Sequence, residues 1–77
     1  MDNTTHEFQF DGGSVRVRCL SDEPGAERWS CGIIPDDGSL PIENYTISEP
    51  YSFLAANSAL TMYKEKYHLN PSTIWTL

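Results

Sequence analysis

The side chains best suited to redox or metal chemistry are two cysteines, Cys19 and Cys31, and two histidines, His6 and His68. If the cysteines oppose each other on neighbouring antiparallel strands, their Cβ atoms lie about 4.5–5.5 Å apart, close enough for a disulfide after a modest adjustment. Buried thiols and a redox-active pair are both open interpretations, and thiols are the usual state inside cells. A zinc site needs four ligands, and no closely spaced cysteine pair is present. The sequence predicts no metal site and no cofactor.

Acidic side chains are the other group that could carry catalysis. Acid–base catalysis needs carboxylates placed in a cleft, and nucleophilic catalysis needs a serine or cysteine beside a histidine. The acids here gather in turn sequences, Asp22-Glu23 and Asp36-Asp37-Gly38, where exposed carboxylates are ordinary. Gly12-Gly13 joins two expected strands, whereas a phosphate-binding loop opens a helix. The sequence therefore predicts no catalytic residues and a protein that is not an enzyme.

Net charge is the strongest compositional feature of this chain of 77 residues. Eleven acidic residues face five basic ones, for a net charge of −6 at pH 7. Basic residues supply most of the affinity for nucleic acids and acidic membranes, so this composition works against both partners. The acid either keeps the domain soluble or forms a surface for a basic protein partner. The candidate residues for such a surface are Asp22, Glu23, Glu27, Asp36 and Asp37.

Chain length and apolar pattern indicate a single small domain, residues 1–77, with one core. No apolar run approaches the ~20 residues that span a bilayer. Residues 1–5 lack the basic and apolar regions of a signal peptide, and we expect them to be flexible. These features predict a cytoplasmic protein with no membrane partner.

Alternating apolar and polar residues predict two strands, one around Phe8 and one around Val17. Gly12-Gly13 lies between them and suits a two-residue hairpin turn. A turn at these glycines pairs Phe8 with Val17 and Glu7 with Arg18. The apolar residues of both strands then share one face of the sheet.

A third strand is expected at residues 28–34, where the same alternation returns. Pro24-Gly25 marks the turn that precedes it. Centring this turn on Gly25 pairs Cys19 with Cys31. That pairing is the basis of the disulfide interpretation.

The last part of the chain predicts a short strand, a helix and a tail. The strand is expected near residues 44–47, and the helix follows over residues 48–69. Ser48 is a good N-cap residue and Pro50 suits the first helical turn. Residues 70–77 form a short tail with β-forming residues, able to add an edge strand.

The predicted fold is α+β, with an antiparallel meander of three to four strands, residues 6–47, packed against one C-terminal helix. The apolar stripe from Phe53 to Tyr67 faces the sheet, and Lys64 is expected on the exposed side. Other apolar residues lie on a second helix face or in the tail: Tyr51, Met62, Leu69 and Trp75. Because one sheet covers one helix face, these residues must contact the tail, a second copy in a homodimer, or a different protein.

The arginines of the outer sheet face, Arg16, Arg18 and Arg28, offer an alternative function. A three-stranded antiparallel sheet on one helix resembles in topology the plant AP2-type domain and the arm-binding domain of some integrases. Those domains lay the sheet in the major groove of DNA, so the resemblance implies a nucleic-acid-binding face. They carry many basic residues there, whereas in this chain Glu7 and Asp22 are expected to oppose two of the three arginines.

The function that the sequence favours is a non-catalytic protein-binding module, an adaptor or inhibitor that presents acidic turns and exposed aromatic residues to a basic partner. In size and charge the chain is similar to the small acidic proteins with which phages and mobile elements block host nucleases or CRISPR complexes, such as anti-CRISPR proteins. The similarity rests on size and charge and on no motif. It implies a partner that itself handles nucleic acid.

Overall fold

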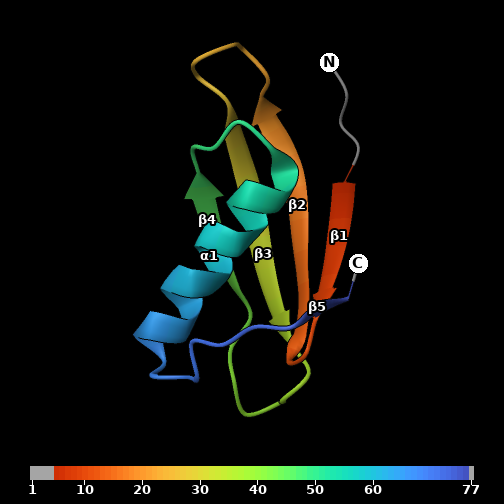
Figure 1. Cartoon of the computed structure of the whole chain (residues 1–77), viewed down its shortest axis with the longest axis vertical. Helices are drawn as coiled ribbons and strands as arrows, with labels where there is room; N and C mark the ends of the chain where they lie inside the picture. The colour runs from red at the N-terminus through yellow and green to blue at the C-terminus, as the bar shows by residue number, and fades with distance from the viewer. Residues whose placement is uncertain (1–4, 77) are drawn as a thin grey trace.

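A computed structural model describes residues 5–76 and shows an α+β fold. Five antiparallel strands form one sheet in the order β4-β3-β2-β1-β5, and one helix packs on one of its faces (Figure 1). The elements are β1 (Thr5–Phe10), β2 (Gly13–Ser21), β3 (Arg28–Pro35), β4 (Glu43–Ile47), α1 (Ser52–Lys66) and β5 (Trp75–Thr76). The predicted fold class is confirmed, including the short edge strand in the tail. The expected flexible segment 1–5 lies outside the described residues except for Thr5, which begins β1.

The register of the first hairpin differs by two residues from the prediction. Phe8 of β1 faces Val15 of β2, and the turn is Asp11-Gly12 instead of Gly12-Gly13. Side chains alternate along a strand with a period of two, so a slip of two residues leaves each one on its predicted face. The predicted register was wrong, whereas the predicted inner face of the sheet is confirmed.

A close backbone approach at Gly13 explains why this residue begins β2. Gly13 pairs with Pro35 of β3 and has a φ of +152°. A Cβ atom at this position would lie 2.3 Å from the main-chain oxygen of Ile34 and 2.9 Å from the Cα atom of Pro35. Only glycine fits here, because any other residue would collide with β3.

The second hairpin is shifted in the same way. Cys31 faces Val17, and Cys19 faces Trp29. A β-bulge between Cys19 and Ser21 adds one residue to β2. The predicted register, which was centred on Gly25, did not include this extra residue. The predicted pairing of Cys19 with Cys31 was therefore wrong, and both cysteines are free thiols.

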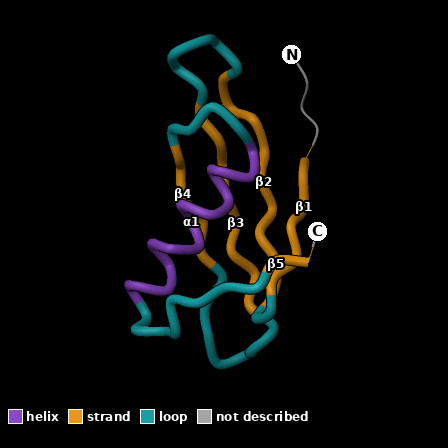
Figure 2. The backbone as a smooth tube through the Cα atoms, in the orientation of Figure 1, coloured by secondary structure: helices purple, strands orange, loops and turns teal. Residues whose placement is uncertain are grey.

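The core lies between the inner face of the sheet and α1. The helix contacts β2, β3 and β4 and runs obliquely across them, while the C-terminal loop returns across the sheet to β1 (Figure 2). The buried side chains of the sheet and helix are Phe10, Val15, Val17, Cys31, Ile33, Ile47, Ala55, Ala56, Ala59, Leu60 and Tyr63. Three small alanines allow the helix to approach the sheet closely, and the larger side chains fill the space beside them.

Helix α1 begins later than the predicted helix over residues 48–69. Its N-cap residue is Tyr51, no side chain caps it, and Ser52 is the first helical residue. The hydroxyl of Ser48 instead donates a hydrogen bond to the main-chain oxygen of Glu27. The expected capping serine therefore contacts the loop between β2 and β3, and the predicted helix start was wrong.

The C-terminus of α1 is set by His68, which has a φ of +54°. The N–H of Leu69 donates to the oxygen of Lys64, and the N–H of His68 donates to the oxygen of Glu65. This pair of bonds is a Schellman motif, which usually carries glycine at the position that His68 occupies. The helix therefore ends before Pro71, the residue expected to stop it.

The tail packs against the sheet through an aromatic cluster. Phe10 and Trp75 are paired where β5 joins the edge of β1. The ring of Trp75 makes edge contacts with Phe8, Phe10 and Phe53, at centroid distances of 6.5, 5.9 and 5.0 Å. Such contacts stabilise beyond the apolar area that they bury. The tail is thereby fixed at the edge of β1, with the Trp75 ring packed against the aromatic side chains of β1 and α1.

Candidate functional site

The acidic residues predicted to bind a partner lie at opposite ends of the sheet. Asp22, Glu23 and Glu27 are in the loop between β2 and β3, and Asp36 and Asp37 are in the loop between β3 and β4 (Figure 1). The molecule extends 36 Å along the axis that separates the two loops. The five residues therefore do not form one continuous acidic surface.

Few of the described acidic residues form ion pairs. In the part of the chain that the structure describes, such pairs join Arg16 to Glu7 and Lys66 to Glu43, each with an N–O distance of 2.8 Å. The Lys66–Glu43 contact also raises the pKa of Lys66. None of the acidic residues in the two loops takes part in these pairs. Asp22, Glu23, Asp36 and Asp37 are exposed, so their negative charge faces solvent.

The carboxylate of Asp37 accepts two hydrogen bonds within the β3–β4 loop. Its Oδ1 atom accepts hydrogen bonds from the N–H of Ser39 at 2.9 Å and from the Ser39 hydroxyl at 2.7 Å. These bonds lower the pKa of Asp37 because they favour the charged carboxylate. Asp37 is therefore a fixed negative charge at neutral pH.

The three arginines lie on the outer sheet face, because they alternate with residues that face α1. Glu7 opposes Arg16 rather than Arg18, and Arg28 faces Ser21 rather than an acid. The prediction that acids oppose Arg18 and Arg28 was wrong, since both registers are shifted. Arg16 and Arg18 share a shallow hollow of about 390 Å³ on this face.

The four apolar residues predicted to form an interaction surface separate into two pairs. Tyr51 and Met62 are 69% and 48% exposed. Leu69 and Trp75 are half-buried and pack against the core, because the tail folds back onto the sheet. A contact between two copies of the chain through this helix face would rest on Tyr51, Met62 and the exposed Leu54.

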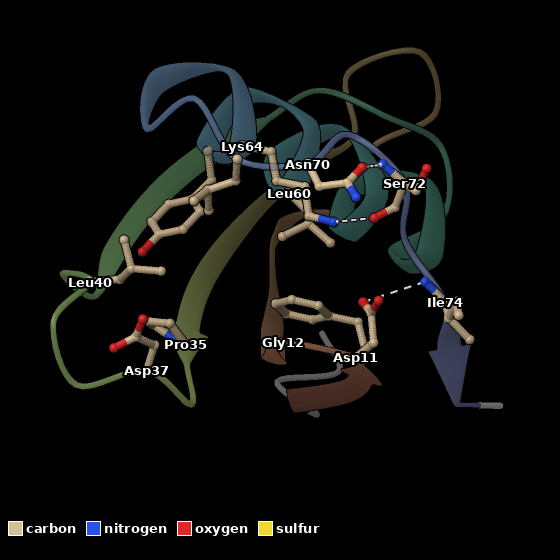
Figure 3. A pocket seen from close by; sticks show the side chains of 13 residues that line it. Asp11, Gly12, Pro35, Asp37, Leu40, Leu60, Lys64, Asn70, Ser72 and Ile74 are labelled. Carbon is tan, nitrogen blue, oxygen red and sulfur yellow. Dashed lines mark hydrogen bonds between the residues drawn. The ribbon is translucent and has the colours of Figure 1, made fainter.

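A cavity of about 420 Å³ opens at the end of the sheet that carries the β1–β2 turn and the β3–β4 loop, the lower end in Figure 1. It lies between α1, these two connections and the C-terminal tail (Figure 3). Its apolar walls come from Phe10, Leu40, Leu60, Tyr63, Leu69 and Ile74. Ligand pockets commonly occupy about 300–1,000 Å³ and have mostly apolar walls. This lower cavity is the candidate functional site.

Three charged residues line the lower cavity: Asp11, Asp37 and Lys64. Lys64 is 8% exposed, so its predicted place on the solvent side of the helix was wrong. Its Nζ atom donates hydrogen bonds of 2.7 Å to the main-chain oxygen of Ser72 and to the hydroxyl oxygen of Thr73. The tail therefore provides the partners that make burial of this ammonium group tolerable.

The two thiols occupy different environments. Cys31 is fully buried, and burial raises the pKa of its thiol to about 11. Cys19 is half-buried beside the bulge. In residues 5–76, no group of three or more His, Cys, Asp and Glu side chains is placed to hold a metal ion. Over the same range, no helix is long and apolar enough to cross a membrane.

Comparisons with protein-family models, with curated proteins and with solved structures find no match to this chain. The candidate site therefore rests on the geometry of the lower cavity. Sequence analysis singled out two of its lining residues, Asp37 and Leu69. Sequence analysis did not identify Asp11 and Lys64 as site residues. The cavity forms where the C-terminal tail packs against α1 and the β1–β2 turn, and no local sequence pattern indicates where the tail packs.

Proposed function

We propose that the protein is a non-catalytic binding module, an adaptor or an inhibitor, that holds a basic segment of a protein partner at the lower cavity. One observation carries this proposal: the exposed acidic pair Asp36 and Asp37 borders an open apolar cavity, and Asp37 is itself part of the lining. Protein interfaces combine an apolar centre with a polar rim in this way. The lower end offers both within one small area.

The distribution of charge supports a basic partner. The chain has a net charge of −6, and the described ion pairs involve none of the acidic loop residues. Fixed charges of one sign attract an oppositely charged partner and raise its association rate, an effect that salt weakens. In this proposal Asp22, Glu23 and Glu27 add to the long-range attraction, while Asp36 and Asp37 contact the partner.

Basic surfaces are typical of proteins that bind nucleic acids. A small acidic module that occupies such a surface would block it. Phage and mobile-element inhibitors, to which the chain is similar in size and charge, imply this mode of action. We therefore propose a nucleic-acid-handling protein as the partner, and the cytoplasm as the place of the encounter. A module of this kind acts by occupying its partner's surface and needs no catalytic group of its own.

A selection from a peptide library tests this proposal, because it asks only which sequences the protein binds. Random peptides displayed on phage are selected against the immobilised protein at low ionic strength. We expect the selected peptides to be rich in Lys and Arg, and to bind at least about tenfold more weakly to Asp36→Lys/Asp37→Lys, a loss of about 1.4 kcal/mol. The matched reversal Asp22→Lys/Glu23→Lys at the opposite end should weaken binding much less. Peptides without basic residues, or equal losses for both variants, would contradict the proposal.

A second candidate function, nucleic-acid binding by the outer sheet face, is favoured by one observation. Arg16 and Arg18 lie together in a hollow of that face, and Arg18 takes no part in the ion pairs among the described residues. A gel-shift experiment with mixed DNA and RNA at low salt tests it. A shift that disappears in Arg16→Glu/Arg18→Glu supports nucleic-acid binding, and no shift at high micromolar protein removes it.

A further inference from the structure

The lower cavity combines an apolar interior with two carboxylates. We infer that it accepts a large apolar or aromatic group that carries a positive charge close to it, such as an aromatic side chain beside a lysine or arginine in the partner's segment. The inference rests on the proposed function and names the chemical group that the partner inserts. The apolar walls of the cavity would contact the ring, and the acidic side chains would contact the cation.

The interior of the cavity is suited to a ring. Its floor is formed by Phe10, Leu60 and Tyr63, which are 9%, 2% and 1% exposed and belong to the core. Leu40 from the β3–β4 loop and Ile74 from the tail form walls nearer the solvent. Burial of apolar surface stabilises by about 25 cal/mol per Å². A group that fills this cavity therefore buries more apolar surface, and binds with a more favourable free energy, than the same group on the protein surface.

The cavity is held open by hydrogen bonds between its walls. The hydroxyl of Tyr63 donates to the main-chain oxygen of Pro41 at 2.6 Å, which fixes the β3–β4 loop against the helix. The N–H of Asp36 donates to the oxygen of Gly12 at 2.9 Å, which joins that loop to the β1–β2 turn. A preformed site loses less conformational entropy when a ligand binds. The lower cavity therefore does not need to close around its occupant.

The charge of the lining favours a cation. Asp11 and Asp37 come from different loops of the lower end (Figure 3). Asp11 accepts one long hydrogen bond, 3.4 Å, from the N–H of Ile74, and both bonds to Asp37 go to its Oδ1 atom. Each carboxylate therefore keeps acceptor capacity for a donor from the occupant. The residue before Asp37, Asp36, adds a further negative charge at the edge.

Lys64 is the one positive charge among the residues that line the cavity. Its ammonium group donates to the tail, lies 5.8 Å from the centroid of the Phe10 ring, and belongs to a residue that is 8% exposed. Two carboxylates, those of Asp11 and Asp37, line the cavity beside this one ammonium group. The balance of the lining is therefore negative, and a carboxylate on the ligand should weaken binding.

Three indole compounds with the same ring and different charge test the inference directly. They are tryptamine, which is a cation, the neutral indole-3-ethanol, and the anion indole-3-propionate. Each is titrated into the ¹⁵N-labelled protein while the amide shifts are recorded. We expect shifts around Gly12, Leu40 and Leu69, and tryptamine should bind about tenfold more tightly than the propionate, the factor that corresponds to about 1.4 kcal/mol.

Four variants separate charge from shape. Asp37→Asn should reduce the preference for tryptamine, whereas Asp22→Asn at the opposite end should reduce it much less. Leu40→Trp and Ile74→Trp should each block binding by filling the cavity, and Ile74 is 71% exposed, so its replacement spares the core. Equal binding of the three compounds, tighter binding of the anion, or shifts confined to another part of the protein would overturn the inference.

The failure of the inference can be told apart from the failure of the proposed function. Selected basic peptides that bind Ile74→Trp as well as the wild type, but lose affinity for Asp36→Lys/Asp37→Lys, overturn the cavity occupant and leave the binding module intact. Selective tryptamine binding without any selected basic peptide supports the cavity occupant and contradicts the proposed function.

Discussion

The ammonium group of Lys64 lies 2.7 Å from the main-chain oxygen of Ser72 and joins the helix to the C-terminal tail. A second bond of the same length reaches the hydroxyl of Thr73. These contacts hold the chain between α1 and β5 in place, and that segment forms one wall of the lower cavity. The site therefore depends on a side chain whose charge is buried.

Removal of this ammonium group should loosen the tail. Lys64→Met keeps most of the apolar stem but leaves the oxygens of Ser72 and Thr73 without their donor. Because hydrogen bonds to charged groups contribute about 1.5–3 kcal/mol, we expect the free energy of unfolding to fall by that amount in urea denaturation. Lys66→Met, which removes an exposed ion pair, is the matched control and should change the midpoint little. Equal midpoints for both variants would rule out this role for Lys64.

Replacement of His68 by glycine should stabilise the protein. His68 adopts a left-handed conformation, φ +54°, at the position of the Schellman motif that glycine prefers. We expect His68→Gly to raise the free energy of unfolding by about 0.5–1 kcal/mol, since glycine adopts this conformation without strain. Asn57→Gly, on the exposed side of the helix interior, should instead lower it by about 0.1–0.5 kcal/mol. A loss of stability in His68→Gly would show that the imidazole makes contacts that matter more than the backbone.

Gly13 should tolerate no larger residue. Gly13→Ala would place a Cβ atom 2.3 Å from the oxygen of Ile34, at a φ of +152°. We expect a loss of about 2 kcal/mol or more in urea denaturation, because β2 and β3 must move apart. Gly38→Ala is the control, since a Cβ atom there meets no atom within 4 Å. If both variants unfold at one midpoint, β3 does not approach Gly13 this closely.

The buried thiol of Cys31 predicts a loss of stability at high pH. Its pKa in the folded protein, about 11, lies above the ordinary value of 9.0, so the folded state binds the proton more tightly. This contribution is fully present below pH 9 and is lost as the pH rises towards 11. The free energy of unfolding, measured under reducing conditions, should fall less steeply above pH 9 in Cys31→Ala than in the wild type. An equal or steeper fall in Cys31→Ala would contradict the assignment.

Local patterns were sufficient to predict the faces of the strands but not their register. The alternation around Val15 and Val17 identifies the buried side of β2, because side chains on a strand alternate with a period of two. The register depends on contacts that alternation does not report, namely the close approach of β3 to Gly13 and the bulge after Cys19. The pairing of the two cysteines was wrong for this reason.

The lower cavity could not be predicted from local patterns. Asp37 was recognised as an acidic turn residue, but its neighbours in the cavity come from the hairpin turn, the helix and the tail. Lys64 was assigned to the exposed side because it lies away from the apolar stripe in the helical spacing. In the structure it is buried, because the main-chain oxygen of Ser72 and the hydroxyl of Thr73 accept hydrogen bonds from its ammonium group. Cavities formed by chain segments far apart in sequence depend on tertiary packing, which the spacing of residues within one helix does not determine.

The position of a bound basic peptide tests the central claim most directly. The tightest peptide from the library selection is added to the ¹⁵N-labelled protein, and the amide shift of each residue is followed. We predict that the largest shifts occur at Gly12, Asp37 and Leu69, around the lower cavity. The largest shifts at Glu23 or Arg18 would instead place the peptide at the opposite end or on the outer sheet face, and would contradict the account.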